Sequence, residues 1–595
     1  MRSTITCAVL LAAISQCAIA ADDPVPLPPD MQSAWRKAGA AIGWVEPTNY
    51  TFHFLPGSRG FGTEIPAFRC QPAFDAAALA KLPIPNRPFG IQFVEPLSSA
   101  NIKVLAALQD VHALSIVRAQ LSADDLQRIA ELPNLRLLDL RYASLNDQDI
   151  PAIGRFKRLE HLDLDGTDIT GKNLSKLAGV STLRSLLLAN TKITDAGLAD
   201  ISSLPQFHRL DLSFTHIEGP GLKHLAPLKE LRALTLFESQ VGDAGLSHLG
   251  ELQRLQTLDL GKTKLSDLGL KELKRLKKLQ SLNVQATLIS DAGLAEMPGI
   301  EDLQSLDLSR CNLSADGIKN LLPCKKLLSL NLALTNLDDR AAAELGKLRT
   351  LQSLDFGFTG VTDAGVQHLS SLQHLTALSL ENTKISAAGP KHLAGLRKLE
   401  SLNLEQTAVT GIGTDGFERL LDLNLSKTKV TDAGLAGIDR MRQLEDLNLS
   451  ETGITDKALI PIGRLEKLQR LNLRKTRITD DGLRHTSGAK QLRVLDLTDA
   501  LITDAGLKAL TNFPEIVKLE LTGTKVTDQG IAALQSLKEL QYLSLARTSL
   551  TDKAANRLTQ FDRLYSLNLY KTSVTSEGLR RIQNALPALA VFPRE

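Results

Sequence analysis

The sequence predicts an α/β fold: a curved solenoid with one long parallel sheet on its concave side and short helices on its convex side. A 24-residue pattern recurs along most of the chain. Each copy begins with apolar and other residues in the alternation typical of a short strand. It continues with apolar residues at the spacing of a helix. Aromatic residues make up only 4% of the chain, so its 43% apolar fraction is largely aliphatic. An array of units also explains how 595 residues can fold without one oversized closed core.

The repeated unit reads L-x-x-L-x-L-x-x-T-x-I-T-D-x-G-L-x-x-L-x-x-L-x-x, and we number its positions from the first Leu. Residues 183–206, 255–278 and 492–515 are clear copies. The spacing is unbroken for units that start from Val111 to Leu399. The unit at 399–419 has 21 residues, and the 24-residue spacing resumes at Leu420. Twenty units result, and position four is Leu in all of them.

Each fixed position has a physical reason. L-x-x-L-x-L predicts a strand whose Leu side chains enter the core while the intervening residues face the opposite side. The Thr at position nine is expected to turn inward and satisfy backbone groups where the strand bends away. Thr194 and its equivalents are expected to N-cap a short helix, with Asp195 stabilised by the helix dipole. Leu198, Ile201 and Leu204 then close the core from the convex side.

The pattern resembles the leucine-rich-repeat family over most of the chain. The most similar variants are the cysteine-containing repeats of F-box proteins and the Thr-rich repeats of secreted planctomycete proteins. Fifteen units carry Thr at position nine, where many relatives carry Asn or Cys. Because strands stack about 4.8 Å apart and helices need 8–10 Å, such an array curves with its strands inside. The resemblance implies partner binding on the concave face.

One short stretch suggests catalysis when it is considered alone. Residues 162–170, LDLDGTDIT, resemble the D-x-D-G-T motif of haloacid-dehalogenase-like phosphatases, in which Asp163 would be the nucleophile and Asp165 the general acid. The repeat explains the same residues. Asp163 occupies position five, as Asp in several other units does, and Thr167 is the usual position-nine Thr. We therefore expect no catalytic residue, no cofactor and no enzyme activity.

The ends of the chain differ from the repeats. The first twenty residues predict an export signal cleaved after Ala20, because Arg2 precedes an apolar run and a small-x-small site, so we expect a secreted or periplasmic protein. Trp35 and Trp44 belong to a short helix that begins an N-terminal cap. The predicted organisation is a signal peptide at 1–20, a leader and cap at 21–110, the solenoid at 111–587 and a cap strand at 588–595.

Composition narrows the classes of partner. A net charge of +3 without a basic run does not favour nucleic acid. After cleavage Cys70, Cys311 and Cys324 remain, which is neither a disulfide framework nor a metal-ligand pattern. A bridge between Cys311 and Cys324 stays open. We expect no metal, no transmembrane anchor in the mature chain and a monomer.

Concave residues are those at positions three, five, seven and eight. Position five carries an Asp/Asn row, which we interpret as sheet architecture, with ligand binding as the less favoured alternative. Apolar, aromatic and basic residues at such positions are better candidates for a binding surface, because the fold does not require them. The candidates at these positions are Tyr142, Phe214, Phe237, Leu334, Phe358, Arg470, Arg474, Lys475, Tyr542, Arg547 and Tyr570. Tyr565, at position two, is added because it falls within two units of Tyr542 and Tyr570.

Three functional classes follow from the sequence. The first is an exported, non-enzymatic recognition scaffold that binds a protein partner through the concave face, with a glycan as a possible alternative ligand. The second, implied by the resemblance of the repeats, is an F-box-like ubiquitin-ligase substrate adaptor; residues 21–110 show no convincing three-helix F-box. The third is an enzyme with its site in residues 45–85, a segment too short for a catalytic domain.

Overall fold

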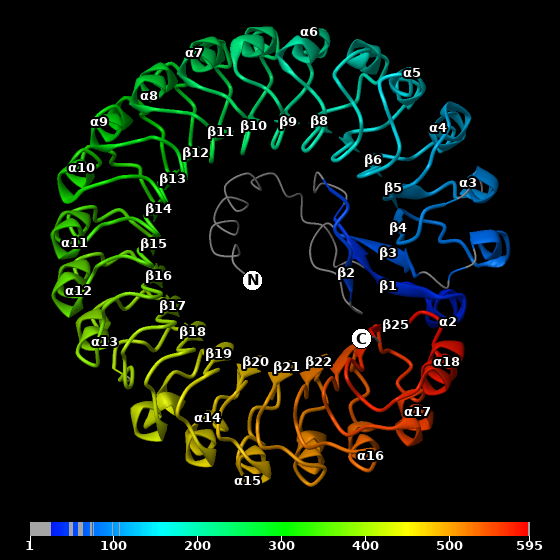
Figure 1. Ribbon diagram of the computed structural model, residues 1–595, viewed down its shortest axis with the longest axis vertical. Helices are drawn as coiled ribbons and strands as arrows, with labels where there is room; N and C mark the ends of the chain where they lie inside the picture. Colours follow the sequence, from blue (N-terminus) through cyan, green and yellow to red (C-terminus); the bar gives the residue numbers. More distant parts are fainter. Residues whose placement is uncertain are drawn as a thin grey trace. The chain divides into compact units, whose positions relative to one another are not determined.

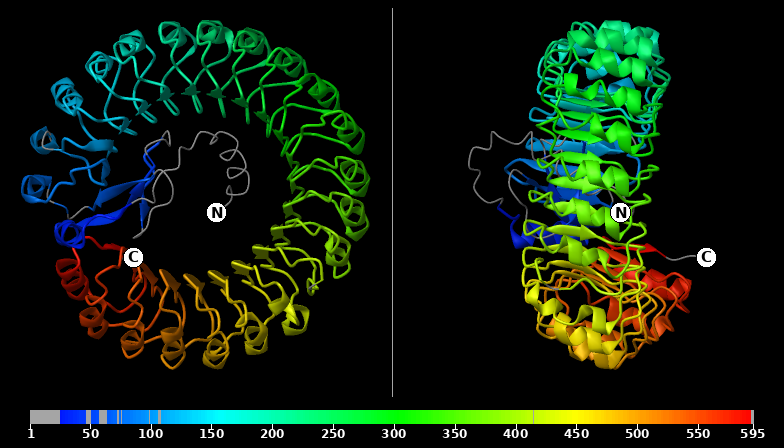
Figure 2. Two further views of the ribbon diagram at one scale, coloured as in Figure 1. Left: turned by 180° about the vertical axis from the view of Figure 1, so that it is seen from behind. Right: turned by 90° about the vertical axis from the view of Figure 1, so that its left-hand side faces the viewer.

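A computed structural model describes residues 25–46, 51–56, 64–71, 74, 76–97, 99–105, 108–413 and 415–592. The predicted export signal at 1–20 lies outside these residues. The chain divides into two compact units, one ending at Cys311 and the other beginning at Asn312. In each unit the strands form one layer and the helices another, with the strands on the inner side of the repeats (Figures 1 and 2). The α/β repeat fold predicted from the sequence is confirmed.

The first unit contains an N-terminal cap followed by the first repeats. Its strands are β1 (Ala40–Val45), β2 (Leu55–Pro56), β3 (Ile65–Cys70), β4 (Phe89–Phe93), β5 (Val111–Ile116), β6 (Leu137–Asp139), β7 (His161–Asp163), β8 (Ser185–Leu187), β9 (Arg209–Asp211), β10 (Ala233–Thr235), β11 (Thr257–Asp259), β12 (Ser281–Asn283) and β13 (Ser305–Asp307). Its α-helices are α2 (Pro29–Lys37), α3 (Ser99–Leu105), α4 (Ala123–Ala130), α5 (Ile150–Ile153), α6 (Leu198–Ile201), α7 (Asp243–Leu246), α8 (Asp267–Leu273) and α9 (Asp291–Leu294). Its 3₁₀ helices are η1 (Ala76–Lys81), η2 (Leu174–Gly179), η3 (Asp195–Gly197), η4 (Pro220–Leu225), η5 (Ser247–Glu251) and η6 (Met297–Gly299).

The second unit contains repeats of the same kind. Its strands are β14 (Ser329–Asn331), β15 (Ser353–Asp355), β16 (Ala377–Ser379), β17 (Ser401–Asn403), β18 (Asp422–Asn424), β19 (Asp446–Asn448), β20 (Arg470–Asn472), β21 (Val494–Asp496), β22 (Lys518–Glu520), β23 (Tyr542–Ser544), β24 (Ser566–Asn568) and β25 (Ala590–Phe592). Its α-helices are α10 (Ala315–Lys319), α11 (Asp339–Leu345), α12 (Asp363–Leu369), α13 (Gly389–Leu393), α14 (Leu459–Ile462), α15 (Asp480–Arg484), α16 (Ile531–Leu534), α17 (Asp552–Leu558) and α18 (Ser576–Ala585). Its 3₁₀ helices are η7 (Asp432–Leu435), η8 (Ile438–Arg440), η9 (Asp456–Ala458) and η10 (Gly506–Asn512).

The strands pair in parallel and in the register of the repeat. Position four of one repeat lies beside position four of the next, as in the series Leu210, Leu234, Leu258 and Leu282. These Leu side chains are buried, and so are those at positions one and six. Position nine also points inward: the Thr191 hydroxyl donates to the Leu188 carbonyl at 2.7 Å, which is the backbone role expected for this Thr.

Adjacent repeats are also joined by the Asp at position thirteen. One oxygen of Asp456 accepts the backbone N–H of Thr479 in the next repeat at 2.8 Å, and the other accepts its hydroxyl at 2.6 Å. Ser266 makes the same two bonds to Asp243. We expected this Asp to interact with its own helix dipole, but its main partners belong to the next repeat. The Gly at position fifteen makes room for it, because a Cβ at Gly482 would lie 2.2 Å from Asp456 Oδ1.

The unit of 21 residues lacks its helix. Among the described residues between β17 and β18 the chain forms only turns, as its missing residues and glycines predict. Gly413 and Gly416 have φ values of +72° and +89°, a region that other residues rarely adopt.

The N-terminal cap closes the open end of the first unit. β1 pairs with β3 in the antiparallel direction, and β3 then pairs with β4 in parallel, which begins the parallel series. Trp35 of α2 is fully buried and stacks on Phe68, with ring centroids 3.7 Å apart. The expectation that Trp44 belongs to the same helix is wrong, because α2 ends at Lys37 and Trp44 lies on β1. The cap thus covers apolar surface that the first repeat of an array would otherwise expose.

Candidate partner-binding surface

Position eight has the same unusual backbone throughout the array. Its residues adopt positive φ in each repeat, between 50° and 71°, and only Gly166 and Gly523 among them are glycines. None of the twenty is Val, Ile or Thr, the residues least tolerant of this conformation. This left-handed turn follows each strand and leaves the side chain on the concave face, where the residue type varies widely from repeat to repeat.

Phe214 and Phe237, two of the candidates predicted from the sequence, form an aromatic pair. Their ring centroids are 5.5 Å apart with an interplanar angle of 65°, which is an edge-to-face contact. Phe214 occupies position eight with φ +55° and is 47% exposed. The Phe237 ring lies across Gly261, where a Cβ would be 2.8 Å from a ring carbon. The Lys262 ammonium lies 5.1 Å from the centre of the same ring.

Tyr142 lies apart from that pair but has a similar environment. It is 47% exposed, and the Arg118 guanidinium lies 5.8 Å from its ring centre. On the other side the ring lies over Gly166, where a Cβ would be 2.3 Å from it. In the second unit Leu334, which is 41% exposed, and the half-buried Phe358 occupy position eight of successive repeats. Both also have positive φ.

The basic candidates of the second unit are mostly neutralised by neighbouring acids. Three of them form ion pairs: Arg470 with Asp446 at 2.6 Å, Lys475 with Glu451 at 3.4 Å and Arg547 with Asp499 at 2.8 Å. Arg474 is exposed, and its side chain forms no ion pair within the described part of the chain. Of these four candidates, only Arg474 has a cationic group that is not paired with an acid within the described part of the chain.

The three Tyr residues near the end of the array do not form a single cluster. Tyr542 and Tyr565 make an edge-to-face contact with centroids 5.3 Å apart. Tyr565 precedes β24, whereas Tyr570 follows it. The Lys571 ammonium lies 5.2 Å from the centre of the Tyr570 ring. Their proximity in the sequence, within two repeats, does not by itself indicate which of the three residues are in contact.

The position-five row has a defined architectural role. Its side-chain oxygen accepts the backbone N–H two residues later, for example Asp259 from Gly261 and Asn283 from Gln285, both at 2.9 Å. Asn283 also hydrogen-bonds the Asp259 carboxylate, as expected of an Asn placed between acids. Burial nevertheless raises the pKa of Asp259 to about 6. This geometry supports the interpretation of the row as part of the sheet.

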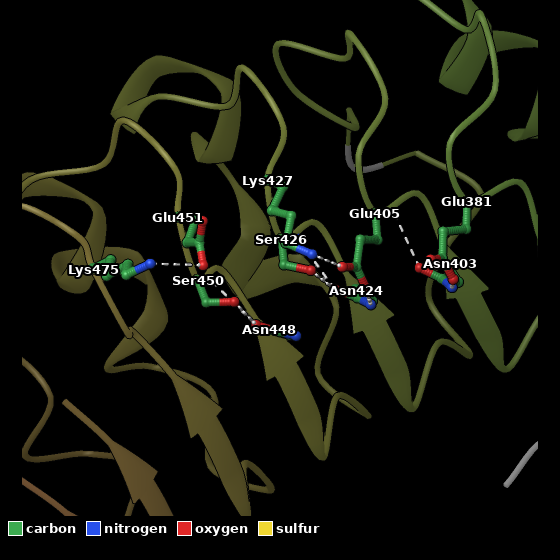
Figure 3. Close-up of polar contacts among 10 residues, drawn as sticks. All are labelled: Glu381, Asn403, Glu405, Asn424, Ser426, Lys427, Asn448, Ser450, Glu451 and Lys475. Atoms are coloured by element: carbon green, nitrogen blue, oxygen red, sulfur yellow. Dashed lines mark hydrogen bonds and ion pairs between the residues drawn. The ribbon is translucent and has the colours of Figure 1, made fainter. Parts of the chain in front are cut away.

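In the second unit the row continues into a polar network (Figure 3). Asn403 Nδ2 donates to Glu381 at 3.3 Å, and Asn424 Nδ2 donates to Glu405 at 3.1 Å. Lys427 Nζ reaches the other oxygen of Glu405 at 2.8 Å. Sequence reasoning missed these Glu and Lys residues; their positions seven and eight in successive repeats were the signal that could have found them.

The phosphatase-like motif is part of the regular sheet. Asp163 ends β7, and one of its oxygens accepts the Asp165 N–H at 3.1 Å, as position five does elsewhere. The Arg141 guanidinium lies 3.5 Å from its other oxygen and 2.8 Å from Asp139. Burial, followed by the charge of Asp139, raises the pKa of Asp163 to about 8 and outweighs the effect of Arg141. A nucleophilic carboxylate must be ionised, so a raised pKa does not favour that role for Asp163.

Metal and redox sites can be assessed over the same residues. No group of three or more His, Cys, Asp or Glu side chains in the described part of the chain is placed to hold a metal ion. Cys70, Cys311 and Cys324 are buried free thiols. Within the described residues no helix has the length and apolarity needed to cross a membrane.

Comparison with known families agrees with this architecture. Models of the leucine-rich repeat match residues 349–409 and, separately, residues 301–322, 464–484 and 490–510. No curated protein shows detectable sequence similarity to the chain.

Several solved structures share the fold at low sequence identity. A leucine-rich-repeat protein of Leptospira interrogans is 24% identical, with 66% of this chain and 98% of that chain aligned and a TM-score of 0.50. The mouse RP105/MD-1 complex contains a chain that is 19% identical, with 81% and 91% aligned and a TM-score of 0.52. The corresponding values for the TLR13–ssRNA13 complex are 19%, 89%, 84% and 0.55. With its repeat, parallel strands and convex helices, the chain is a leucine-rich-repeat protein.

Proposed function

We propose that this protein is an exported, non-enzymatic recognition scaffold that binds a protein partner through its concave face. The observation that supports this most is the exposure of large apolar side chains at position eight, where the left-handed backbone favours none of them. Tyr142, Phe214 and Leu334 are the most exposed of these residues. Exposed aromatic residues beside charged groups are typical anchors of protein interfaces. The solved relative RP105, in complex with MD-1, supports the same kind of role.

A nucleic acid is a weaker candidate partner, although the similar TLR13 was solved with an RNA. The chain has a net charge of only +3, and three of the four basic candidates are neutralised by acids on the same face. Binding to a phosphate backbone requires several uncompensated cations.

The F-box alternative is not supported by the N-terminal region. In its described residues this region forms α2 followed by the antiparallel strands β1, β2 and β3. An F-box would require a bundle of three helices there.

Glycan binding has one favourable observation in the second unit. Asn448 and Asn472 have their side-chain oxygens fixed by the backbone N–H groups of Ser450 and Arg474, at 3.1 Å and 3.0 Å. Their amide N–H groups are therefore held in a constant orientation that could serve sugar hydroxyls. Binding to a glycan array that is lost in Asn448→Ala and Asn472→Ala would favour this alternative over a protein ligand.

The proposal is tested by cross-linking the purified protein to its partners in the exported compartment. We expect the double variant Phe214→Ser with Phe237→Ser to fold normally and to lose most of the captured partner. The matched control is Leu268→Ser with Leu288→Ser, which removes two exposed apolar residues that are not on the concave face. Equal capture of the partner by the unchanged protein, the Phe variant and the Leu control would exclude the Phe pair as the binding site. Fractionation that finds an uncleaved, cytosolic product would contradict export.

A further inference from the structure

Two carboxylates lie on the same face as Phe214 and Phe237 and are not neutralised. Asp211 ends β9 and Asp259 ends β11, and Thr235 of β10 separates them in register. Neither carboxylate forms an ion pair with any residue that the structure describes. The two acids are two strands apart, roughly 9.6 Å, so a charged group placed over Thr235 lies about 5 Å from each of them.

Hydrogen bonds within the sheet hold these acids in place but do not neutralise them. Asp211 Oδ1 accepts the backbone N–H of Ser213 at 2.9 Å and its hydroxyl at 2.6 Å. Asp259 accepts hydrogen bonds from the Gly261 N–H and from the Asn283 amide, both of which are uncharged donors. Its pKa, raised to about 6 by burial, fits a carboxylate without a compensating cation. An external cation would supply that charge.

The aromatic residues show which surface remains available. Lys262 covers the face of Phe237 and is itself paired with Glu238 at 2.7 Å, so this cation is already satisfied. Phe214 touches Phe237 in an edge-to-face contact, and no cation within the described residues lies over its ring. Arg209 also belongs to β9, but it begins the strand, whereas Asp211 ends it.

We infer that this surface, the Phe214 patch formed by Asp211, Phe214, Phe237 and Asp259, binds a Lys or Arg side chain of the protein partner. The apolar stem of that side chain packs against Phe214, and its charged group lies between the two carboxylates. The inference rests on the proposed function and specifies the chemistry of the partner. A cation is attracted both by the aromatic ring and by the two carboxylates, whereas the carboxylates would repel an acidic segment.

The second unit provides a contrast that supports this specificity. Several of its concave cations and acids pair with one another, as Lys427 does with Glu405 and Arg547 with Asp499. At these pairs a partner cation would have to displace an existing one. The Phe214 patch requires no such displacement, because its two acids have no cation to lose.

The inference is tested by selecting random 12-residue peptides, displayed on phage, on the immobilised full chain. We expect the selected peptides to carry Arg or Lys next to an apolar residue. As synthetic peptides they should bind at least about tenfold more weakly to Asp211→Asn with Asp259→Asn, and also to Phe214→Ser, as expected for loss of a charged or aromatic anchor. Replacing their Arg or Lys by Gln should have the same effect. Asp496→Asn, which makes the same change at position five in the second unit, should leave binding unchanged.

The remaining outcomes separate the inference from the function on which it rests. Selection of acidic or uncharged peptides, selection of none, or binding insensitive to the Asp variants would overturn the inference. Partner capture that is lost in the Phe variants but kept in the Asp variants would retain the proposed function and reject only the basic anchor. Capture that is unaffected by either set would reject both at this surface.

Discussion

The concave faces of the two units share one backbone but differ in chemistry. In the first unit, Phe214 and Phe237 lie beside carboxylates that have no cation. In the second, Asn residues fill much of position five, and the nearby Lys and Glu residues neutralise one another. Positions that hold the repeat together are alike in both, whereas positions seven and eight vary. The comparison shows that the fold is fixed by a few positions and that recognition is left to the others.

The largest expected effect lies at a core position that both units share. Leu162→Ala should reduce the free energy of unfolding by roughly 2–5 kcal/mol, because the buried Leu at position four leaves a cavity. Urea denaturation followed by circular dichroism measures the change. The matched control is Asp163→Asn at the next residue, which keeps the side-chain oxygen that accepts the Asp165 N–H. If the control were as damaging as the cavity, position five would be more than a hydrogen-bonding position.

The link between repeats should give the next largest effect. Asp456→Ala removes the charged acceptor of two hydrogen bonds that Thr479 donates, and should lower the free energy of unfolding by about 1–3 kcal/mol. The nearby Asp481 provides the control, because it is exposed and, among the residues that the structure describes, its side chain pairs only with Arg484 in the same turn. Equal losses of stability in Asp456→Ala and Asp481→Ala would show that the link contributes little.

A smaller effect should distinguish the two units by its pH dependence. Asn283→Asp places a carboxylate between Asp259 and Asp307 and should destabilise the protein by roughly 0.5–1 kcal/mol at pH 7.5. The pKa of Asp259 in the folded state, about 6, is above its ordinary value of 3.8. The associated stability is therefore present below pH 3.8 and is lost as the pH rises through 6.

The penalty of Asn283→Asp should accordingly shrink when unfolding is measured at pH 4.5 instead of 7.5. Asn448→Asp is the control in the second unit, where the neighbouring position-five residues are Asn424 and Asn472. Its penalty should be smaller and should vary less with pH. Identical pH profiles would mean that the two rows do not differ electrostatically.

The smallest effects are expected for exposed ion pairs on the concave faces. Lys475→Gln should change the unfolding free energy by less than about 0.5 kcal/mol, because both side chains of its pair with Glu451 are substantially exposed. Lys262→Gln should cost slightly more, since Lys262 also covers the Phe237 ring. Thermal unfolding of both variants compares them. A larger loss in Lys475→Gln would reverse the order.

The fold could be predicted from the sequence because the same pattern of strand, turn and helix residues occurs in twenty units. Strand register, the inward Thr and the loss of the helix in the short unit all follow from position within the repeat. The role of Asp456 did not follow in the same way. Its bonds go to the next repeat, so a rule based on a single helix end attributed this Asp to the wrong partner.

The candidate surface was predictable only in part. Phe214 and Phe237 were placed together because they occupy adjacent positions in successive repeats. The ion pair between Arg547 and Asp499 spans two repeats and passes Gly523, where a Cβ would lie 2.1 Å from Asp499 Oδ1. Whether two side chains can meet across an intervening repeat depends on the size of the residue between them, here Gly523. The spacing of charged residues in the sequence does not reveal this.

The Asp links have a consequence for how the array opens. They run without a gap from Asp432 to Thr575, whereas Ala387 and Gly411 interrupt them on either side of the short unit. Repeats interact mainly with their nearest neighbours, so a missing link cannot be compensated from a distance. The amide hydrogens of residues 387–431 should exchange with solvent earlier than those of the repeats that follow. Single links are also missing at Gly171, Gly219 and Ala315, but only Ala387 and Gly411 stand in consecutive repeats. Thermal fluctuation, proteolysis or an applied force should therefore open the array at the short unit before the repeats that follow it.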